Sequence, residues 1–168
     1  MNLCGDKITL NYIDLKTINL DEYLGWLRDV ENNKYISSSS ISYSRLQLVE
    51  YIKSKNSDPK VLFLGIFIKN EGTFIGTIKL EPINTIEKSA WLGIMIGNTQ
   101  NLGKGFGYEA IKLILIYAKN TLMLKSIFLG VHPNNTPAIK LYRKIGFRYD
   151  KNQLNKMTLS LANFQQNM

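Results

Sequence analysis

A glycine-rich stretch at residues 98–108, NTQNLGKGFGY, carries the clearest chemical signal in this sequence. Gly103, Gly105 and Gly107 alternate with larger residues, after an apolar run and before a helical pattern. Glycine lets the backbone approach a phosphate closely. The amides of a first helical turn point at such an anion, with the positive end of the helix dipole behind them. The stretch therefore predicts a turn between a strand and a helix that binds a pyrophosphate.

The spacing of the glycines excludes two common phosphate-binding loops. A dinucleotide fingerprint requires G-x-G-x-x-G, whereas this stretch contains G-x-G-x-G. A Walker loop requires a lysine followed by Ser or Thr, and Lys104 lies between two glycines instead. The remaining interpretation is a shorter phosphate-binding turn of another kind.

Composition limits the class of protein further. With 168 residues we expect a single domain, residues 1–168, and a net charge of +8 favours acidic partners. Lys and Arg are spread along the chain, so we do not expect nucleic-acid binding. A single cysteine, Cys4, and a single histidine provide neither an internal disulfide nor a Cys/His metal site, and we expect no metal. No apolar run approaches about 18 residues, so we expect a cytoplasmic protein without membrane contact.

The phosphate turn has to be positioned by strands and helices, and hydrophobic periodicity places them along the chain. Alternating or continuous apolar runs predict strands at residues 7–13, 61–68, 73–80, 90–96, 126–131 and 157–161. Helical spacing predicts helices over residues 20–30, from Ser44 through Ile52, over 109–119, and from Pro137 to Gly146. Asn32, Asn33 and residues 37–40 are typical of a loop.

Two local signals support these helix boundaries. Ser44 followed by Gln47 is a candidate capping box, and Pro137 suits the first turn of the last helix. The predicted order is β-α-α-β-β-β-α-β-α-β. We expect an α/β (α+β) fold with a mixed, mostly antiparallel central sheet flanked by helices.

Two sequence motifs carry a family resemblance. Residues 100–105, QNLGKG, fit the cofactor loop [QR]-x-x-G-x-[GA], and residues 135–147 fit N-x-x-A-x-x-x-Y-x-K-x-G-F. In this order and spacing they resemble the GNAT superfamily of acetyl-CoA-dependent N-acetyltransferases. The resemblance covers about residues 7–161 in element order, and its motifs lie after Ala90. Within the superfamily the sequence looks closest to the ribosomal-protein alanine acetyltransferase-like branch.

The resemblance implies a role for each residue that matches a motif. Backbone amides of the glycine loop would hold the pyrophosphate of acetyl-CoA. The strand end before the loop would pair with the pantetheine arm and polarise the thioester carbonyl. Tyr142 would protonate the departing thiolate, because a phenol of pKa ~10 is still protonated at pH 7. The implied cofactor-binding residues are Met95, Ile96, Gly97, Gln100, Leu102, Gly103, Lys104, Gly105, Phe106, Gly107, Tyr108 and Asn135.

Several of these assignments have structural alternatives. Asn135 can serve as a helix N-cap with or without a cofactor contact. Lys104 can contact phosphate or face solvent, and Tyr142 can be a core tyrosine. His132 can face the thioester or be packed or exposed without a role.

No residue is assigned as the general base, because this chain differs from the related branch of the superfamily at one position. The related branch commonly has Ala-Glu-Ile-Gly before the loop, whereas this chain has Ala90-Trp91-Leu92-Gly93. A water chain or Glu81 can then take the proton.

We expect direct attack of an amine on acetyl-CoA within a ternary complex, in a monomer or homodimer. A small-molecule amine, such as an amino sugar or metabolite amine, is the first expectation, and a protein N-terminus is the second. The positive charge argues against a polyamine. A catalytically silent acyl-CoA-binding module and a basic nucleic-acid binder are the other classes. Residues 29–43 and 82–88, which carry no motif, would select the acceptor.

Overall fold

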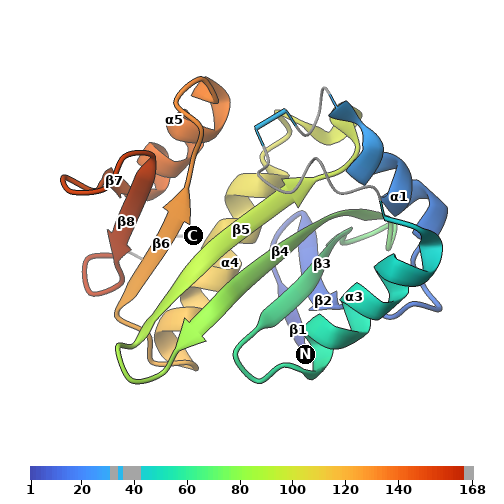
Figure 1. Cartoon of the computed structure of the whole chain (residues 1–168), viewed down its shortest axis with the longest axis horizontal. Helices are drawn as coiled ribbons and strands as arrows, with labels where there is room; N and C mark the ends of the chain where they lie inside the picture. Colours follow the sequence, from blue (N-terminus) through green and yellow to red (C-terminus); the bar gives the residue numbers. More distant parts are fainter. Residues whose placement is uncertain (31–33, 36–42, 165–168) are drawn as a thin grey trace.

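A computed structural model describes residues 1–30, 34–35 and 43–164 of the chain. Within those residues the chain forms one eight-stranded sheet, in the order β1-β2-β3-β4-β5-β6-β8-β7, and helices α1, α3, α4 and α5 (Figure 1). The strands are β1 (Asn2–Cys4), β2 (Ile8–Tyr12), β3 (Leu62–Ile68), β4 (Phe74–Asn84), β5 (Ser89–Ile96), β6 (Ser126–Gly130), β7 (Arg148–Tyr149) and β8 (Lys156–Ser160). The helices are α1 (Leu20–Arg28), α3 (Arg45–Ser57), α4 (Phe106–Asn120) and α5 (Thr136–Ile145), and a short 3₁₀ turn, η1, spans Thr99–Asn101.

The sheet is antiparallel at every junction except one. Strands β5 and β6 run parallel, because α4 connects them by a crossover. The expected mixed, mostly antiparallel sheet flanked by helices is therefore confirmed.

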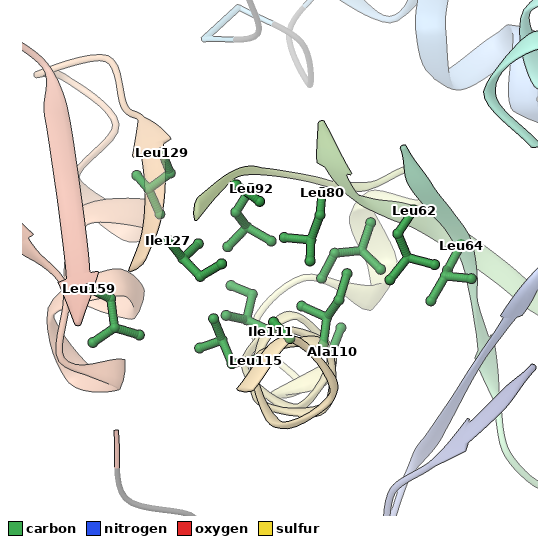
Figure 2. Packing of buried hydrophobic residues seen from close by; sticks show 14 of the residues in the cluster. Leu62, Leu64, Leu80, Leu92, Ala110, Ile111, Leu115, Ile127, Leu129 and Leu159 are labelled. Atoms are coloured by element: carbon green, nitrogen blue, oxygen red, sulfur yellow. The ribbon is translucent and has the colours of Figure 1, made fainter. Parts of the chain in front are cut away.

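Helices cover both faces of the sheet. Figure 2 shows Ala110, Ile111 and Leu115 of α4 packed against side chains of the central strands, including Leu92 and Ile127. The opposite face has a second core, built from α1, α3 and the aromatic ends of β3 and β4. Since both faces around the middle strands are filled, the ends of the strands are where a ligand can enter.

Local chemistry sets the helix boundaries. Asn19 caps α1 by accepting from the amides of Asp21 and Glu22. The capping box at Ser44 and Gln47 is present at the start of α3, as predicted. Gly146 ends α5 with φ of +115°, a conformation that favours glycine.

The structure differs from the sequence predictions at several boundaries. Helix α4 begins at Phe106, three residues before the predicted start at Glu109. Strand β4 continues to Asn84, and α1 ends at Arg28, so that Val30 is 74% exposed. The short strands β1 and β7 were not predicted. The loop predicted at residues 32–33 and 37–40 lies outside the described residues.

Among the described residues no helix is both long and apolar enough to cross a membrane.

Candidate active site

The sheet opens into a wedge between β5 and β6. The two strands pair only from Ser89 to Trp91 and from Ser126 to Phe128. Beyond Trp91 the described part of β5 continues to Ile96 without further pairing to β6, and Figure 1 shows the two strands diverging. The parallel crossover thus leaves one side of the β5 end facing the gap.

The pairing of β5 with β4 decides which backbone groups face this wedge. The Gly97 amide donates to the Ile75 carbonyl at 2.9 Å, and Met95 pairs in register with Thr77. Because backbone groups alternate in direction along an antiparallel strand, those of Met95 and Gly97 face β4. The backbone groups of Ile96 and of Ile94, which was not predicted, face the wedge instead. Finding Ile94 required the register with β4, which the sequence does not contain.

The glycine loop joins the end of β5 to α4. Gly103 and Gly105 have φ of +76° and +88°, in the left-handed region that favours glycine. Within the described residues no backbone amide from Gly103 through Tyr108 donates a hydrogen bond to the protein. Consecutive free amides at a helix N-terminus form an anion-binding nest, so this loop can hold a diphosphate.

The other predicted loop residues surround this nest. Gln100 lies in the 3₁₀ turn and is exposed, as are Leu102 and Lys104. The Lys104 ammonium contacts the side-chain oxygen of Asn101 at 3.3 Å. Phe106 is buried in the core and anchors the first turn of α4.

Helix α5 faces the nest across the wedge. A Cβ on Gly107 would lie 3.7 Å from Leu141 of α5 and 3.8 Å and 4.0 Å from Ile94 and Ile96 of β5. The first turn of α4, the end of β5 and α5 therefore converge at Gly107. Tyr108, next along the chain, has the Lys144 ammonium 4.9 Å from its ring centre.

Tyr142 follows Leu141 on α5 and packs against the hydrophobic core, and its catalytic role stays a prediction. Burial raises the pKa of the Tyr142 phenol to about 12. The residue is half-buried, and no hydrogen bond ties its hydroxyl to another described residue. A neutral phenol is the form that a general acid requires at pH 7.

The predicted residues at the start of α5 have structural roles. Asn135 is the N-cap of the helix, and its side-chain oxygen accepts from the Ala138 amide at 3.3 Å. His132 is exposed and stacks on Tyr35 with ring centres 5.2 Å apart. Its Nδ1 accepts from the Asn134 amide at 3.2 Å, so the lone pair that a neutral imidazole would use as a base is engaged.

The candidate bases on the sheet are also poorly suited. Glu81 binds both Lys55 and Lys79, the latter at 2.7 Å. Burial alone would raise the pKa of Glu81, but the hydrogen bonds from the two lysines outweigh it and lower that pKa. Trp91 is 38% exposed and packs near Phe128 with Lys156 over both rings. None of these groups holds a proton acceptor ready at the wedge.

Similarity to known proteins agrees with this geometry. A family model described as an acetyltransferase (GNAT) domain matches residues 9–148. A Bacillus licheniformis protein named as an uncharacterized N-acetyltransferase, p20, is 27% identical over 149 residues, which cover 87% of this chain and 82% of that protein. The spermidine N(1)-acetyltransferase of Vibrio cholerae is 29% identical over 126 residues, which cover 74% and 72% of the two chains.

A solved structure has the same fold. The spermidine N-acetyltransferase from Vibrio cholerae, in complex with CoA and spermine, superposes with a TM-score of 0.81 at 22% identity, covering 93% of this chain and 96% of that one. The family match spans most of the chain, from β2 into β7. The chain belongs to the GNAT family of acetyltransferases, whose members take the acetyl group from acetyl-CoA.

Proposed function

We propose that this enzyme acetylates a primary amine of low basicity on a small molecule, by direct attack on acetyl-CoA within a ternary complex. The observation that carries the proposal is the nest of amides from Gly103 through Tyr108, which donate to no other described residue and lie next to a wedge walled by β5 and α5. A diphosphate in the nest leaves the thioester arm to extend along the wedge, where backbone groups of Ile94 and Ile96 face it.

The residues at the wedge divide the chemistry between them. Backbone amides of β5 polarise the thioester carbonyl as the amine nitrogen forms its bond to the acetyl carbon. The carbon–sulfur bond then breaks, and Tyr142 gives its proton to the leaving thiolate. The proton lost from the amine nitrogen passes to water, since Glu81 and His132 are engaged by Lys55, Lys79 and the Asn134 amide. The Tyr142 phenolate takes a proton back from water, which restores the phenol.

Because no side chain removes a proton from the amine, this mechanism favours an acceptor whose amine is already partly unprotonated at pH 7. An α-amino group has a pKa of about 7.7–8.0, whereas an alkylamine such as that of lysine has a pKa of about 10.4. Electron-withdrawing oxygens likewise lower the basicity of amines on sugars. The chain's net charge of +8 also disfavours a polycation. Amino sugars therefore rank above polyamines, the acceptor class named for the Vibrio cholerae relative.

A protein N-terminus is the second candidate. It has an α-amino group of the same low basicity. A peptide backbone and a small metabolite differ in size rather than in basicity, so only direct comparison separates them.

The test is release of free thiol from acetyl-CoA with a panel of amines. The panel contains amino sugars, free and linked to nucleotides, α-amino acids, spermidine and peptides with free N-termini. We expect turnover with a weakly basic small amine to exceed that with spermidine by at least about tenfold at pH 7. Preferred turnover of spermidine overturns the proposed acceptor class. Thermal stabilisation by CoA without thiol release from any amine points to a silent binding module.

A further inference from the structure

The turn between β1 and β2 lies against the start of α4, about a hundred residues away in the sequence. The Lys7 amide donates to Oε1 of Glu109 at 2.9 Å, and the Lys7 ammonium donates to the Lys104 carbonyl at 3.2 Å. Lys104 lies within the phosphate nest, residues 103–108, and Glu109 directly follows it. One residue of an N-terminal hairpin thus holds the nest and the residue that follows it.

Gly5 makes room for the first of these contacts. A Cβ on Gly5 would lie 1.9 Å from Oε1 and 2.9 Å from Cδ of Glu109, so any side chain there would displace the carboxylate. The turn itself is anchored, because the Gly5 amide donates to the Ile8 carbonyl and the Lys69 ammonium donates to the Gly5 carbonyl, both at 2.9 Å. The Glu109 carboxylate therefore contacts a turn that is itself held in place by hydrogen bonds.

The contacts set the direction of amides in the nest. A peptide unit is planar, with its C=O and N–H pointing in opposite directions. Holding the Lys104 carbonyl with Lys7 therefore orients the Gly105 amide on the other side. The first backbone bond of α4, from the Glu109 amide to the Gly105 carbonyl at 3.1 Å, orients the Phe106 amide without using the Glu109 side chain. Gly105 has a left-handed φ of +88°, and holding a glycine in one conformation costs conformational entropy that these contacts offset.

We propose that Gly5, Lys7 and Glu109 form a clamp that presets the nest for the diphosphate of acetyl-CoA. The inference rests on the proposed function and adds positioning residues to the same site. Glu109 gives the clamp a sharp test. If it acted only through its charge, removing a carboxylate near a bound diphosphate would tighten binding. As part of a clamp, its removal weakens binding.

The experiment compares Glu109→Ala with Glu109→Gln by titrating CoA into each enzyme in a calorimeter. Glutamine keeps a side-chain oxygen that can accept from the Lys7 amide. We expect a roughly three- to twentyfold higher Kd for CoA with Glu109→Ala and a Kd at or below that of wild type with Glu109→Gln, which keeps the acceptor and loses the negative charge. The exposed Lys7 ammonium contributes less, so Lys7→Met should raise the Kd about two- to fivefold, and Lys7→Arg should restore it. Gly5→Ala should resemble Glu109→Ala.

A kinetic readout separates positioning from general damage to the fold. The KM for acetyl-CoA should rise in Glu109→Ala while kcat and the KM for the amine stay near wild type. Gly25→Ala on α1 is the matched control, because a Cβ there meets nothing within 4 Å. Tighter CoA binding by Glu109→Ala, or equal loss in the Ala and Gln variants, overturns the clamp. If the wild-type protein itself binds no CoA, the proposed function fails instead.

Discussion

The ring of Tyr142 meets the ring of Phe147 nearly edge-on, with ring centres 5.9 Å apart and planes inclined at 62°. Phe147 is fully buried and fixes the phenol of its neighbour on the last turn of α5. Burial raises the pKa of Tyr142 to about 12, which keeps its proton in place at any physiological pH. The packing that immobilises the ring thus also keeps it in the form that can donate a proton.

Replacing Tyr142 by phenylalanine should separate catalysis from binding. The variant keeps the ring packing on Phe147 but lacks the acidic proton, so kcat should fall roughly a hundred- to ten-thousandfold. The Kd for acetyl-CoA should barely change. An unchanged kcat would remove Tyr142 from the mechanism.

The same pKa predicts how the wild-type rate depends on pH. A general acid loses activity as the pH rises through its pKa, which for Tyr142 is about 12. The rate at saturating substrates should therefore show no decline due to Tyr142 below about pH 11. A decline centred near pH 8 that disappeared in Tyr142→Phe would contradict the raised pKa.

Gly107→Ala should weaken the binding of acetyl-CoA without lowering the stability of the fold. Its φ is not in the left-handed region, and an added Cβ makes only ordinary contacts of 3.7–4.0 Å with Leu141, Ile94 and Ile96. Alanine is favoured over glycine within a helix by up to about 1 kcal/mol, so Gly107→Ala should not lower Tm. The new methyl group fills the wedge between β5 and α5, and the KM for acetyl-CoA should rise at least about fivefold.

Gly103→Ala provides the contrasting control for that substitution. Its φ of +76° strains any side chain, although a Cβ there meets no atom within 4 Å. This variant should lose both stability, by about 1 kcal/mol, and affinity for acetyl-CoA. If Gly107→Ala behaved in the same way, strain rather than occupancy of the wedge would explain its effect.

The sequence was sufficient where the signal was local. The glycine spacing predicted the nest, and the capping box at Ser44 predicted the start of α3. Strand β7 spans only two residues, which is too few for any periodicity to be recognised. The early start of α4 was missed because Gly105 and Gly107 flank Phe106, and glycine is a poor helix former.

The rest of the site depends on contacts between distant segments. Lys7 and Glu109 are 102 residues apart, and nothing in either neighbourhood indicates the other. Whether Met95 or Ile94 faces the wedge depends on the register with β4, and a shift of one residue reverses it. The binding roles of the motif residues remain predictions, which the variants above test.

Glu81→Gln tests whether the ion cluster on β4 serves structure or catalysis. The glutamine cannot balance Lys55 and Lys79, and the side chain of Glu81 is only 20% exposed. Stability should fall by about 1–2 kcal/mol, between the values typical of exposed and buried pairs. The pH dependence of kcat/KM should remain that of wild type. If the fall of kcat/KM at low pH disappeared in the variant, Glu81 would be the general base.

The stability effect of Glu81 also has a predictable pH window. The folded pKa of Glu81 lies below its unfolded value of about 4.3, so the carboxylate contributes its stability above that pH. This contribution disappears as the pH falls through the folded pKa. Urea unfolding should therefore show a gap between wild type and Glu81→Gln at pH 6 that narrows below about pH 4.

The contact between Gly97 and Trp26 predicts that the effect of Gly97→Ala on stability changes sign when Trp26 is replaced. A Cβ on Gly97 would lie 1.9 Å and 2.0 Å from Cδ2 and Cε3 of the Trp26 indole, which is itself packed on Phe74 at 5.1 Å. The indole has little room to move, so Gly97→Ala should cost about 1–3 kcal/mol and lower Tm by roughly 3–10 °C. In a Trp26→Ala background the same methyl group enters the space that the indole leaves. There Gly97→Ala should be neutral or stabilising. A double-mutant cycle by thermal unfolding measures this coupling, and additive effects would show that the two residues do not compete for space.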